Sequence, residues 1–227
     1  MAHPPLSIVM PVLNEAAGLG AALQALTPFI ARGVQLIVAD GGSSDGTATL
    51  AMAAGATVTA APPGRALQMN AGATHASAAV LLFLHADTVL PERADRLIAE
   101  ALVSGKNVWG RFDVRIAGQS PMLRVVASFM NLRSRLSGIA TGDQAIFMTR
   151  AAFVAVGGFA PQPLMEDIEI SKRLRLLSRP ACLSEKVMTS GRRWETRGVW
   201  RTVLLMWRLR FAYWRGAAPE QLAERYR

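Results

Sequence analysis

Short apolar runs alternate with longer amphipathic segments over the first hundred residues of the chain. Four of these runs, at residues 6–13, 34–40, 56–61 and 79–85, are bounded by glycine, proline or polar residues and predict strands. The segments between them predict helices: one over 14–32 capped by Asn14, a short one ending near 54, one over 66–77, and one that Pro91 opens and that ends near 103. Strands alternating with helices in this way predict a parallel sheet with both faces covered.

The pattern is less regular after residue 107. It predicts strands at 108–116 and 144–150, helices at 121–136 and 165–178, and a last helix over 199–215 that is rich in tryptophan and arginine. No repeat or long linker divides the chain. We therefore expect an α/β fold: one domain over residues 1–198 and a helical tail over 199–227.

Composition limits the classes of protein that fit. The chain has 227 residues, of which 51% are hydrophobic and 18% charged, so it is expected to fold around one sizeable core. The net charge of +9 favours partners rich in phosphate, such as nucleotides, nucleic acid or an anionic membrane. A single cysteine, Cys182, excludes an internal disulfide and is interpreted as a small buried apolar residue. No apolar run reaches about 18 residues and no Lys or Arg precedes Arg32, so we expect a soluble or peripheral cytoplasmic protein.

Polar residues follow three of the predicted strands where each strand ends. The carboxyl ends of parallel strands share one edge of a sheet, so these residues should converge there. Each one alone is explained more simply as a turn former or a helix cap, whereas the whole set indicates a ligand site. The residues are Asn14, Glu15, Asp40, Asp45, His85 and Asp87.

Further charged residues suggest the kind of ligand. Arg65 precedes a predicted helix and is either solvated or placed to meet phosphate oxygens. Asp87 suits Mg²⁺ or Mn²⁺ on a diphosphate, since such a cation needs only one or two protein carboxylates. His85 is as readily explained as a hydrogen-bonded core histidine as by a contact with a ligand. Glu166 and Asp167 begin a helix, where they either stabilise its amino terminus or supply a general base.

The segments "PVLNE", "DGGSSDGT", "MNAG", "FLHADT", "GGF" and "EDIE", in this order, resemble the family-two inverting glycosyltransferases with a GT-A fold. The likeness covers roughly residues 6–177, and "RRWETRGVWRT" is similar to a small bacterial subgroup of unassigned substrate. The resemblance implies a Rossmann-like, mostly parallel central sheet flanked by helices, with a nucleotide-binding half over about 1–90 and an acceptor half over 91–198. It also implies a hexosyltransferase-type reaction, in which a sugar moves with inversion from a UDP-sugar, or as second choice a GDP-sugar, to an acceptor hydroxyl.

The resemblance also implies a role for particular residues. "HAD" stands where the family has Asp-x-Asp, so Asp87 matches the aspartate that binds Mn²⁺ or Mg²⁺, while His85 and Ala86 would contact the donor. His85 departs from the family pattern and brings no negative charge. Asp167 matches the catalytic base, with Glu166 beside it as a possible contact. The nucleotide pocket would comprise Pro11, Asn14, Glu15, Asp40, Asp45, Arg65 and Asn70.

Processive members of the family carry a Gln-x-x-Arg-Trp signature after the base. Here Arg193 and Trp194 are present but Ser190 replaces the glutamine, so we expect a single transfer. Arg193 could contact diphosphate and Trp194 an acceptor sugar; surface packing is equally compatible with both. Two other classes are weighed: a nucleotidyltransferase, which usually has a basic, glycine-rich signature after the first strand, and a non-enzymatic basic module that binds membrane. Nucleic acid is not an expected partner.

The predicted tail helix is apolar on two sides. At 3.6 residues per turn, its larger apolar face is bordered by a row of arginines, and a smaller apolar face lies elsewhere on the helix. An ordinary packed helix would leave one of these faces bare. We therefore expect one face to pack on the domain and the other on the inner membrane surface or a second copy, which would bring a lipid-linked acceptor near Asp167. The larger face comprises Trp200, Val203, Leu204, Trp207, Phe211 and Trp214, the smaller comprises Leu205, Met206 and Leu209, and the arginines are Arg197, Arg201, Arg208 and Arg215.

Overall fold

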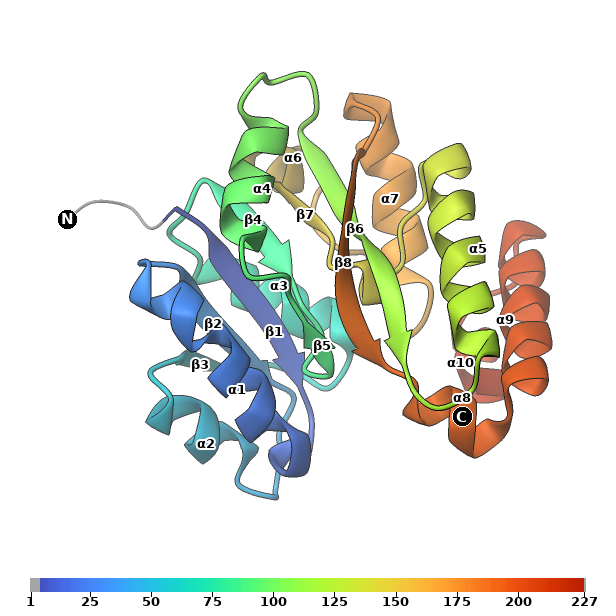
Figure 1. Cartoon of the computed structure of the whole chain (residues 1–227), viewed down its shortest axis with the longest axis horizontal. Coiled ribbons are helices and arrows are strands. Elements are labelled where there is room, and N and C mark those ends of the chain that lie inside the picture. Colours follow the sequence, from blue (N-terminus) through green and yellow to red (C-terminus); the bar gives the residue numbers. More distant parts are fainter. Residues whose placement is uncertain (1–4, 227) are drawn as a thin grey trace.

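A computed structural model describes residues 5–226, and its strands form one eight-stranded sheet in the order β3-β2-β1-β4-β7-β6-β8-β5 (Figure 1). The strands are β1 (Ser7–Val12), β2 (Gln35–Asp40), β3 (Thr57–Ala60), β4 (Val80–Phe83), β5 (Thr88–Val89), β6 (Trp109–Ala117), β7 (Phe147–Thr149) and β8 (Ala181–Ser190). The helices are α1 (Ala16–Ala31), α2 (Thr47–Ala53), α3 (Arg65–Thr74), α4 (Ala94–Leu102), α5 (Met122–Ser137), the 3-10 turn η1 (Gly142–Gln144), α6 (Arg150–Ala155), α7 (Glu166–Leu177), α8 (Arg192–Arg197), α9 (Val199–Trp214) and α10 (Pro219–Tyr226).

The amino-terminal half of the sheet is parallel, as the sequence predicted. β1 pairs in parallel with β2 and with β4, and β2 pairs in parallel with β3. All six residues of β1 are buried, which agrees with a strand covered on both faces. In this register Val12 lies beside Asp40, so the ends of β1 and β2 meet at one edge.

The carboxyl-terminal half of the sheet is mixed. β7 is antiparallel to both β4 and β6, β8 is parallel to β6, and the short β5 is antiparallel to β8. The sequence pattern did not predict β8, because most of its residues are exposed or half-buried and it therefore lacks the apolar signature of an inner strand. The expected α/β fold is thus confirmed, with a sheet that is less uniformly parallel than predicted.

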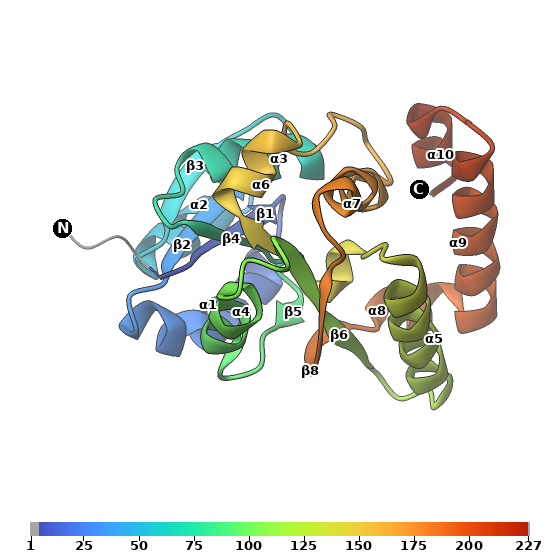
Figure 2. The same ribbon diagram turned by 90° about the horizontal axis from the view of Figure 1, so that it is seen from above.

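Helices cover both faces of the sheet (Figure 2). Residues of α1, α4 and α5 pack in one core cluster, and residues of α3, α6 and α7 pack in a second cluster on the opposite face. A third, smaller cluster joins the start of α7 to α9 and α10, so the helical tail is packed on the helix that carries Glu166 and Asp167. Its buried members are Ile139, Leu164, Met165, Ile168, Leu209 and Leu222. None of the helices within residues 5–226 is long and apolar enough to cross a membrane.

Three local predictions were wrong. Asn14 does not cap α1: it lies in the left-handed region with φ of 53°, and Glu15 is the N-cap residue. α4 begins at Ala94 instead of at Pro91, because a turn separates the two. Cys182 is half-buried, since it lies at the sparsely covered start of β8.

Candidate active site

The loop that follows β2 is bound to the end of β1 through a serine. The buried carboxylate of Asp40 accepts hydrogen bonds from the backbone N–H of Ser43, at 3.2 and 3.1 Å, and from its hydroxyl group. The Ser43 hydroxyl oxygen in turn accepts from the N–H of Asn14 at 2.9 Å. The side-chain oxygen of Asn14 accepts from the N–H of Ser44, also at 2.9 Å. The structure therefore brings Asn14 and Asp40 together at the predicted edge of the sheet.

Asp45 holds the starts of two helices. One of its carboxylate oxygens accepts from the N–H and the hydroxyl of Thr47, at 3.0 and 2.5 Å, and the other accepts from the N–H of Ala16 at 3.0 Å. The Thr47 hydroxyl oxygen also accepts from the N–H of Glu15 at 2.9 Å. The hydrogen bonds from Thr47 and Ala16 lower the pKa of the Asp45 carboxyl. In this structure Asp45 satisfies the first free N–H group of α1 and of α2.

Two side-chain amides on α3 bind the ends of β1 and β2 and the loop after α6. The buried side chain of Gln68, which the sequence analysis missed, donates to the carbonyl oxygens of Val12 at 2.6 Å and Ala39 at 3.0 Å, at the ends of β1 and β2. Asn70 donates to the carbonyl oxygen of Phe159 at 2.8 Å and accepts from its N–H at 2.9 Å. Asn70 thereby fixes the loop after α6, while Arg65, the first residue of α3, remains exposed.

His85, Ala86 and Asp87 lie in a turn between β4 and β5. The predicted strand over residues 79–85 is too long at its end, because β4 ends at Phe83 and His85 lies outside it. The ring of His85 is half-buried and lies against Gly142, where an added Cβ would approach the ring to 2.5 Å. Asp87 is exposed to solvent.

The structure places a carboxylate beside His85 that the sequence analysis did not identify. Asp143 lies in η1, which two residues separate from β7, and its Oδ1 is 3.5 Å from Nδ1 of His85. Burial alone would raise the pKa of Asp143, but the contact with His85 and the positive charges of Arg65 and Arg193 together lower it. Asp143 thus supplies a negative charge next to the position where "HAD" lacks one. The antiparallel pairing of β7 with β4 creates this proximity.

Glu166 and Asp167 occupy the first two positions of α7. Asp167 is half-buried; its Oδ2 accepts from the N–H of Gly142 at 3.0 Å and its Oδ1 from the N–H of Ile168 at 2.7 Å. Burial raises the pKa of Asp167, with a further contribution from the charge of Asp143, although these two hydrogen bonds oppose the shift. Burial and the charge of Asp167 raise the pKa of Glu166 to about 7, against the positive charge of Arg65.

A small cavity connects these residues. Its volume is about 10 Å³, which is close to the space that one water molecule needs. Two acids on α7, the imidazole and a glycine face it, together with apolar side chains from both halves of the sheet. The lining residues are Met69, Phe83, His85, Gly142, Ile146, Phe159, Glu166 and Asp167.

Two arginines lie close enough to these acids for their charges to interact. Pairing of β5 with β8 brings the turn that holds Asp87 beside the end of β8, from which the chain enters α8. Burial and neighbouring arginines lower the pKa of Arg193 on α8, whereas Asp143 and Asp87 oppose this shift. Burial also lowers the pKa of Arg133 on α5, and the charge of Asp167 opposes it. Arg133 is a residue that the sequence pattern did not single out, because nothing in a helical segment indicates what it faces.

Trp194 and Arg193 have different surroundings. Trp194 is half-buried and packs against the first core cluster, as expected for a structural residue. The guanidinium of Arg193 lies 4.2 Å from the ring centroid of Tyr226 on α10. The last described helix therefore contacts a residue of the candidate site.

The side chains around Asp87 fit a hard cation that arrives with a ligand. Within residues 5–226, no three His, Cys, Asp or Glu side chains are grouped as a metal site. Asp87 is exposed, with the Thr88 hydroxyl at 3.4 Å. One accessible carboxylate suits Mn²⁺ or Mg²⁺ whose other ligands are diphosphate oxygens and water.

Comparison with protein families identifies the chain. It matches the model of glycosyl transferase family 2 over residues 7–158, which is more than half of its length. The chain therefore belongs to this family, which removes the nucleotidyltransferase alternative. A search of curated proteins gave no match.

Solved structures share the fold at low sequence identity. Mannosyltransferase PcManGT from Pyrobaculum calidifontis, in complex with GDP-Man and Mn²⁺, has a TM-score of 0.67 and 16% identity, covering 100% of this chain and 70% of the other. An S. aureus TarS fragment with UDP-GlcNAc has a TM-score of 0.66 and 15% identity over 82% of this chain, which spans 58% of that fragment. Glucosyl-3-phosphoglycerate synthase from Mycobacterium tuberculosis, with Mn²⁺, UDP and glucosyl-3-phosphoglycerate, has a TM-score of 0.60 and 22% identity, covering 80% and 70% of the two chains.

Proposed function

We propose that this protein transfers a single hexose, with inversion and with the help of Mn²⁺ or Mg²⁺, from a UDP-sugar to an acceptor hydroxyl. The observation that carries the proposal is the position of Asp167: a half-buried carboxylate of raised pKa, held by two backbone N–H groups, on the same cavity as His85. Structural neighbours that hold UDP, UDP-GlcNAc or GDP-Man support a nucleoside diphosphate donor.

The donor would lie along the edge formed by the strand ends. Asp40 at the end of β2 would accept a hydrogen bond from an N–H of the base, which both uracil and guanine offer. Arg65 and Arg193 would meet the diphosphate, since guanidinium groups pair well with phosphate oxygens. Asp87 would hold the cation together with the diphosphate. When bound, the cation neutralises charge that builds on the leaving diphosphate.

Asp167 would act as the general base. The acceptor oxygen attacks the anomeric carbon, the bond from that carbon to the diphosphate oxygen breaks, and the acceptor proton passes to Asp167. Because burial raises the pKa of Asp167, its carboxylate binds that proton more strongly than an ordinary aspartate would. A single displacement inverts the anomeric carbon and needs no enzyme nucleophile.

A thermal-shift titration tests the donor class, because a ligand that binds only the folded state raises the unfolding temperature. The panel is UDP, GDP, ADP and CDP, each with and without Mn²⁺. We expect the largest rise with UDP and Mn²⁺, and GDP second. Protection by adenosine or cytidine nucleotides alone would overturn the assignment. Release of UDP from a UDP-sugar, measured with candidate acceptors, then tests transfer.

A further inference from the structure

Two neighbouring helices carry rows of exposed apolar side chains. α5 and α9 lie side by side along one side of the molecule in both views (Figures 1 and 2). On α9 the row is Trp200, Leu204, Trp207, Phe211 and Trp214, each between 57% and 74% exposed. On α5 it is Val125, Phe129, Leu132 and Leu136, each between 43% and 78% exposed. We call these nine side chains the α5–α9 face.

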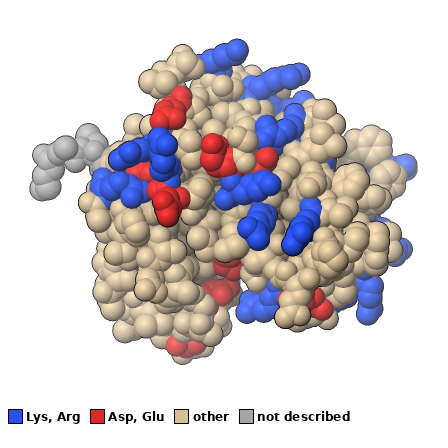
Figure 3. All heavy atoms as spheres, in the orientation of Figure 1, with Lys and Arg blue, Asp and Glu red and all other residues tan. Residues whose placement is uncertain are grey.

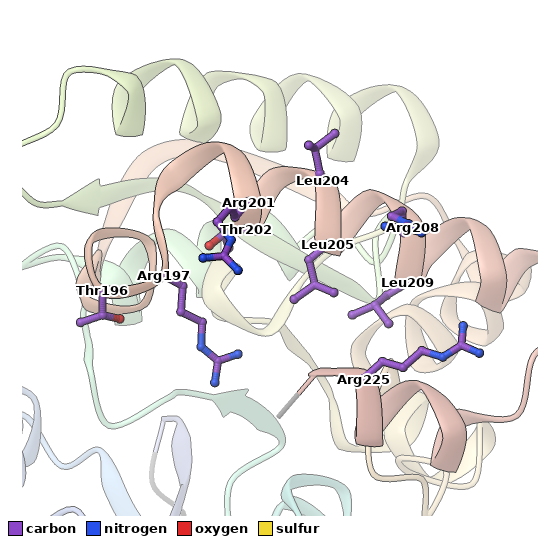
Figure 4. A pocket seen from close by; sticks show the side chains of 9 residues that line it. All are labelled: Thr196, Arg197, Arg201, Thr202, Leu204, Leu205, Arg208, Leu209 and Arg225. Carbon is purple, nitrogen blue, oxygen red and sulfur yellow. The ribbon is translucent and has the colours of Figure 1, made fainter.

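Both helices already bury their opposite sides. On α9, Leu209 is buried in the third core cluster and Leu205 packs against it. Figure 4 shows Leu205 and Leu209 pointing toward α10, whereas Leu204 points away from it. On α5, Leu123 and Ala127 are buried in the first core cluster. The smaller apolar face of the tail helix is thus its packing face, and the larger face is exposed apart from Val203, which is half-buried. Many exposed large apolar side chains on two neighbouring helices indicate an interaction site.

The charged side chains carried by α5 and α9 themselves are all positive. Residues 119–142, which include α5, and residues 196–219, which include α9, contain arginines but no Asp, Glu or Lys. In Figure 3 the charged side chains on the α9 side of the molecule are mostly Lys and Arg. Such a surface is complementary to an anionic one.

A groove beside the α5–α9 face carries several of these arginines. It has a volume of about 890 Å³ and lies along α9, facing α10 (Figure 4). Exposed arginines from both helices line it, next to leucines of α9. They include Arg201, Arg208 and Arg225, with Leu204, Leu205 and Leu209. The groove is large enough for a phosphate-bearing head group.

We propose that the α5–α9 face docks on an anionic lipid bilayer. The three tryptophans would lie at the level of the head groups, where indole rings are favoured, and the groove arginines would contact lipid phosphates. A second copy of this chain fits less well. A two-fold interface places the same patch on both sides, so the arginines of one copy would face those of the other with no acid on either helix to pair with them.

Docking would place the candidate site next to the membrane. The hydroxyl of Tyr213 on α9 donates to Glu169 on α7 at 3.1 Å, and Lys172 lies 4.7 Å from the ring centroid of Tyr213. α9 is therefore attached to the helix that begins with Glu166 and Asp167. A lipid-linked acceptor would be accessible there; this step rests on the proposed function, whereas docking itself does not.

Vesicle flotation of the full chain tests the docking. The vesicles contain phosphatidylcholine alone or mixed with phosphatidylglycerol. We expect the protein to float with the mixed vesicles, to float less as salt is added, and to stay at the bottom with phosphatidylcholine alone. A protein that stays at the bottom with both kinds of vesicle, or floats equally with both, overturns the proposal.

Paired variants identify the surface responsible. Trp207→Ser with Phe211→Ser should weaken partitioning at least about tenfold, because two of the most exposed aromatic side chains are lost. The matched control is Val154→Ser with Leu176→Ser, which removes exposed apolar side chains on α6 and α7 and should float like the wild type.

The contribution of the arginines is tested in the same way, with a double variant and a matched control. Arg201→Glu with Arg208→Glu should weaken partitioning by roughly 20-fold or more, since each basic contact strengthens binding about fivefold. Arg96→Glu with Arg179→Glu changes the net charge equally, elsewhere on the surface, and should have a smaller effect.

Three outcomes would contradict the proposal. The first is an equal loss of flotation in a variant and its control, and the second is no loss of flotation in either the apolar or the arginine variant. The third is a dimer in solution that only the Trp207→Ser, Phe211→Ser variant converts to monomer. The last would assign the face to a second copy. The UDP-induced rise in unfolding temperature should be the same in all four variants, so failure of docking and failure of the proposed function are distinguishable.

Discussion

The polar side chains of the candidate site have different surroundings at the ends of β1 and β2 and at the start of α7. At the ends of β1 and β2, the side chains of Asn14, Asp40 and Asp45 are engaged in hydrogen bonds with the neighbouring loop. At the start of α7, the buried Glu166 and the half-buried Asp167 lie next to one another with raised pKa values. In the first region the polar side chains have hydrogen-bond partners in the turns. In the second, burial disfavours the charged form of Glu166 and Asp167.

In the proposed function, this difference would separate the residues that bind the nucleotide from those that carry out the chemistry. Hydrogen-bonded turns hold a rigid edge on which a nucleotide can lie, and they need no unusual protonation. A general base instead benefits from burial, because a raised pKa makes its carboxylate a better proton acceptor. Removing two adjacent acids from water costs stability, so the half that holds the proposed base should be the part of the fold in which function and stability compete.

The largest effect is expected from Asp167→Asn. An amide cannot accept the acceptor proton, so turnover should fall by about 10²–10⁴-fold while the UDP-induced rise in unfolding temperature is kept. Glu169→Gln, two positions later on the same helix, is the control and should retain most of the turnover. Near-normal turnover in Asp167→Asn would remove this residue from the chemistry.

Glu166→Gln tests the cost of the buried acids. Because the pKa of Glu166 is raised from its ordinary 4.5 to about 7, the folded state binds more protons than the unfolded state between these values. Its contribution therefore makes stability fall as pH rises through this window, by about 3 kcal/mol in all.

Glutamine removes that contribution, so the free energy of unfolding should fall less between pH 4.5 and pH 7.5 in the variant than in the wild type. Urea unfolding at both pH values measures the difference. Glu169→Gln again serves as control, since Glu169 is partly exposed. Parallel pH dependence in Glu166→Gln and the wild type would show that Glu166 is not the group responsible.

The part of the site at the ends of β1 and β2 could be predicted from the sequence, because its position follows from the order of strands and helices along the chain. Strand ends that carry Asn14, Asp40 and Asp45 could be placed at one edge because strand–helix alternation fixes parallel neighbours. Asp143 could not be placed beside His85 in this way, because their proximity depends on the antiparallel pairing of β7 with β4, residues that are far apart in the chain.

Contacts between segments far apart in the chain also explain why β8 and the role of Gln68 were not predicted. β8 has few buried residues and no strong alternation, so its pairing with β6 decides its structure more than its own sequence does. Gln68 looks like any polar residue of a helix until the ends of β1 and β2 are placed above it. The two faces of α9 were predicted, since helical periodicity alone defines them.

Asn70→Ala tests the connection between the two halves. Asn70 is predicted to line the nucleotide pocket, yet its amide both donates to and accepts from the backbone of Phe159. Loss of two partly buried hydrogen bonds should lower the free energy of unfolding by about 2 kcal/mol.

Asn107→Ala is the control, because its side chain donates to the exposed carbonyl of Arg179 and its loss should cost less than about 1 kcal/mol. UDP titration of Asn70→Ala at a temperature where it stays folded separates the two roles. Unchanged affinity assigns Asn70 to structure, and a loss of affinity with little loss of stability assigns it to the nucleotide.

Asp87→Asn should have the smallest of these effects, because Asp87 belongs to neither kind of environment: it is exposed and lies in the turn that joins the two halves. An amide is a weaker ligand for a hard cation than a carboxylate, so UDP affinity in the presence of Mn²⁺ should fall by about tenfold, while affinity without metal should be unchanged. Titration calorimetry with and without Mn²⁺ measures both. Asp143→Asn is the informative companion: if the carboxylate beside His85 also serves the cation, this variant should lose Mn²⁺-dependent affinity as well, and if it only orients His85, it should not. Equal loss of affinity with and without Mn²⁺ in Asp87→Asn would show that Asp87 contacts the nucleotide directly and that the cation, if used, is held elsewhere.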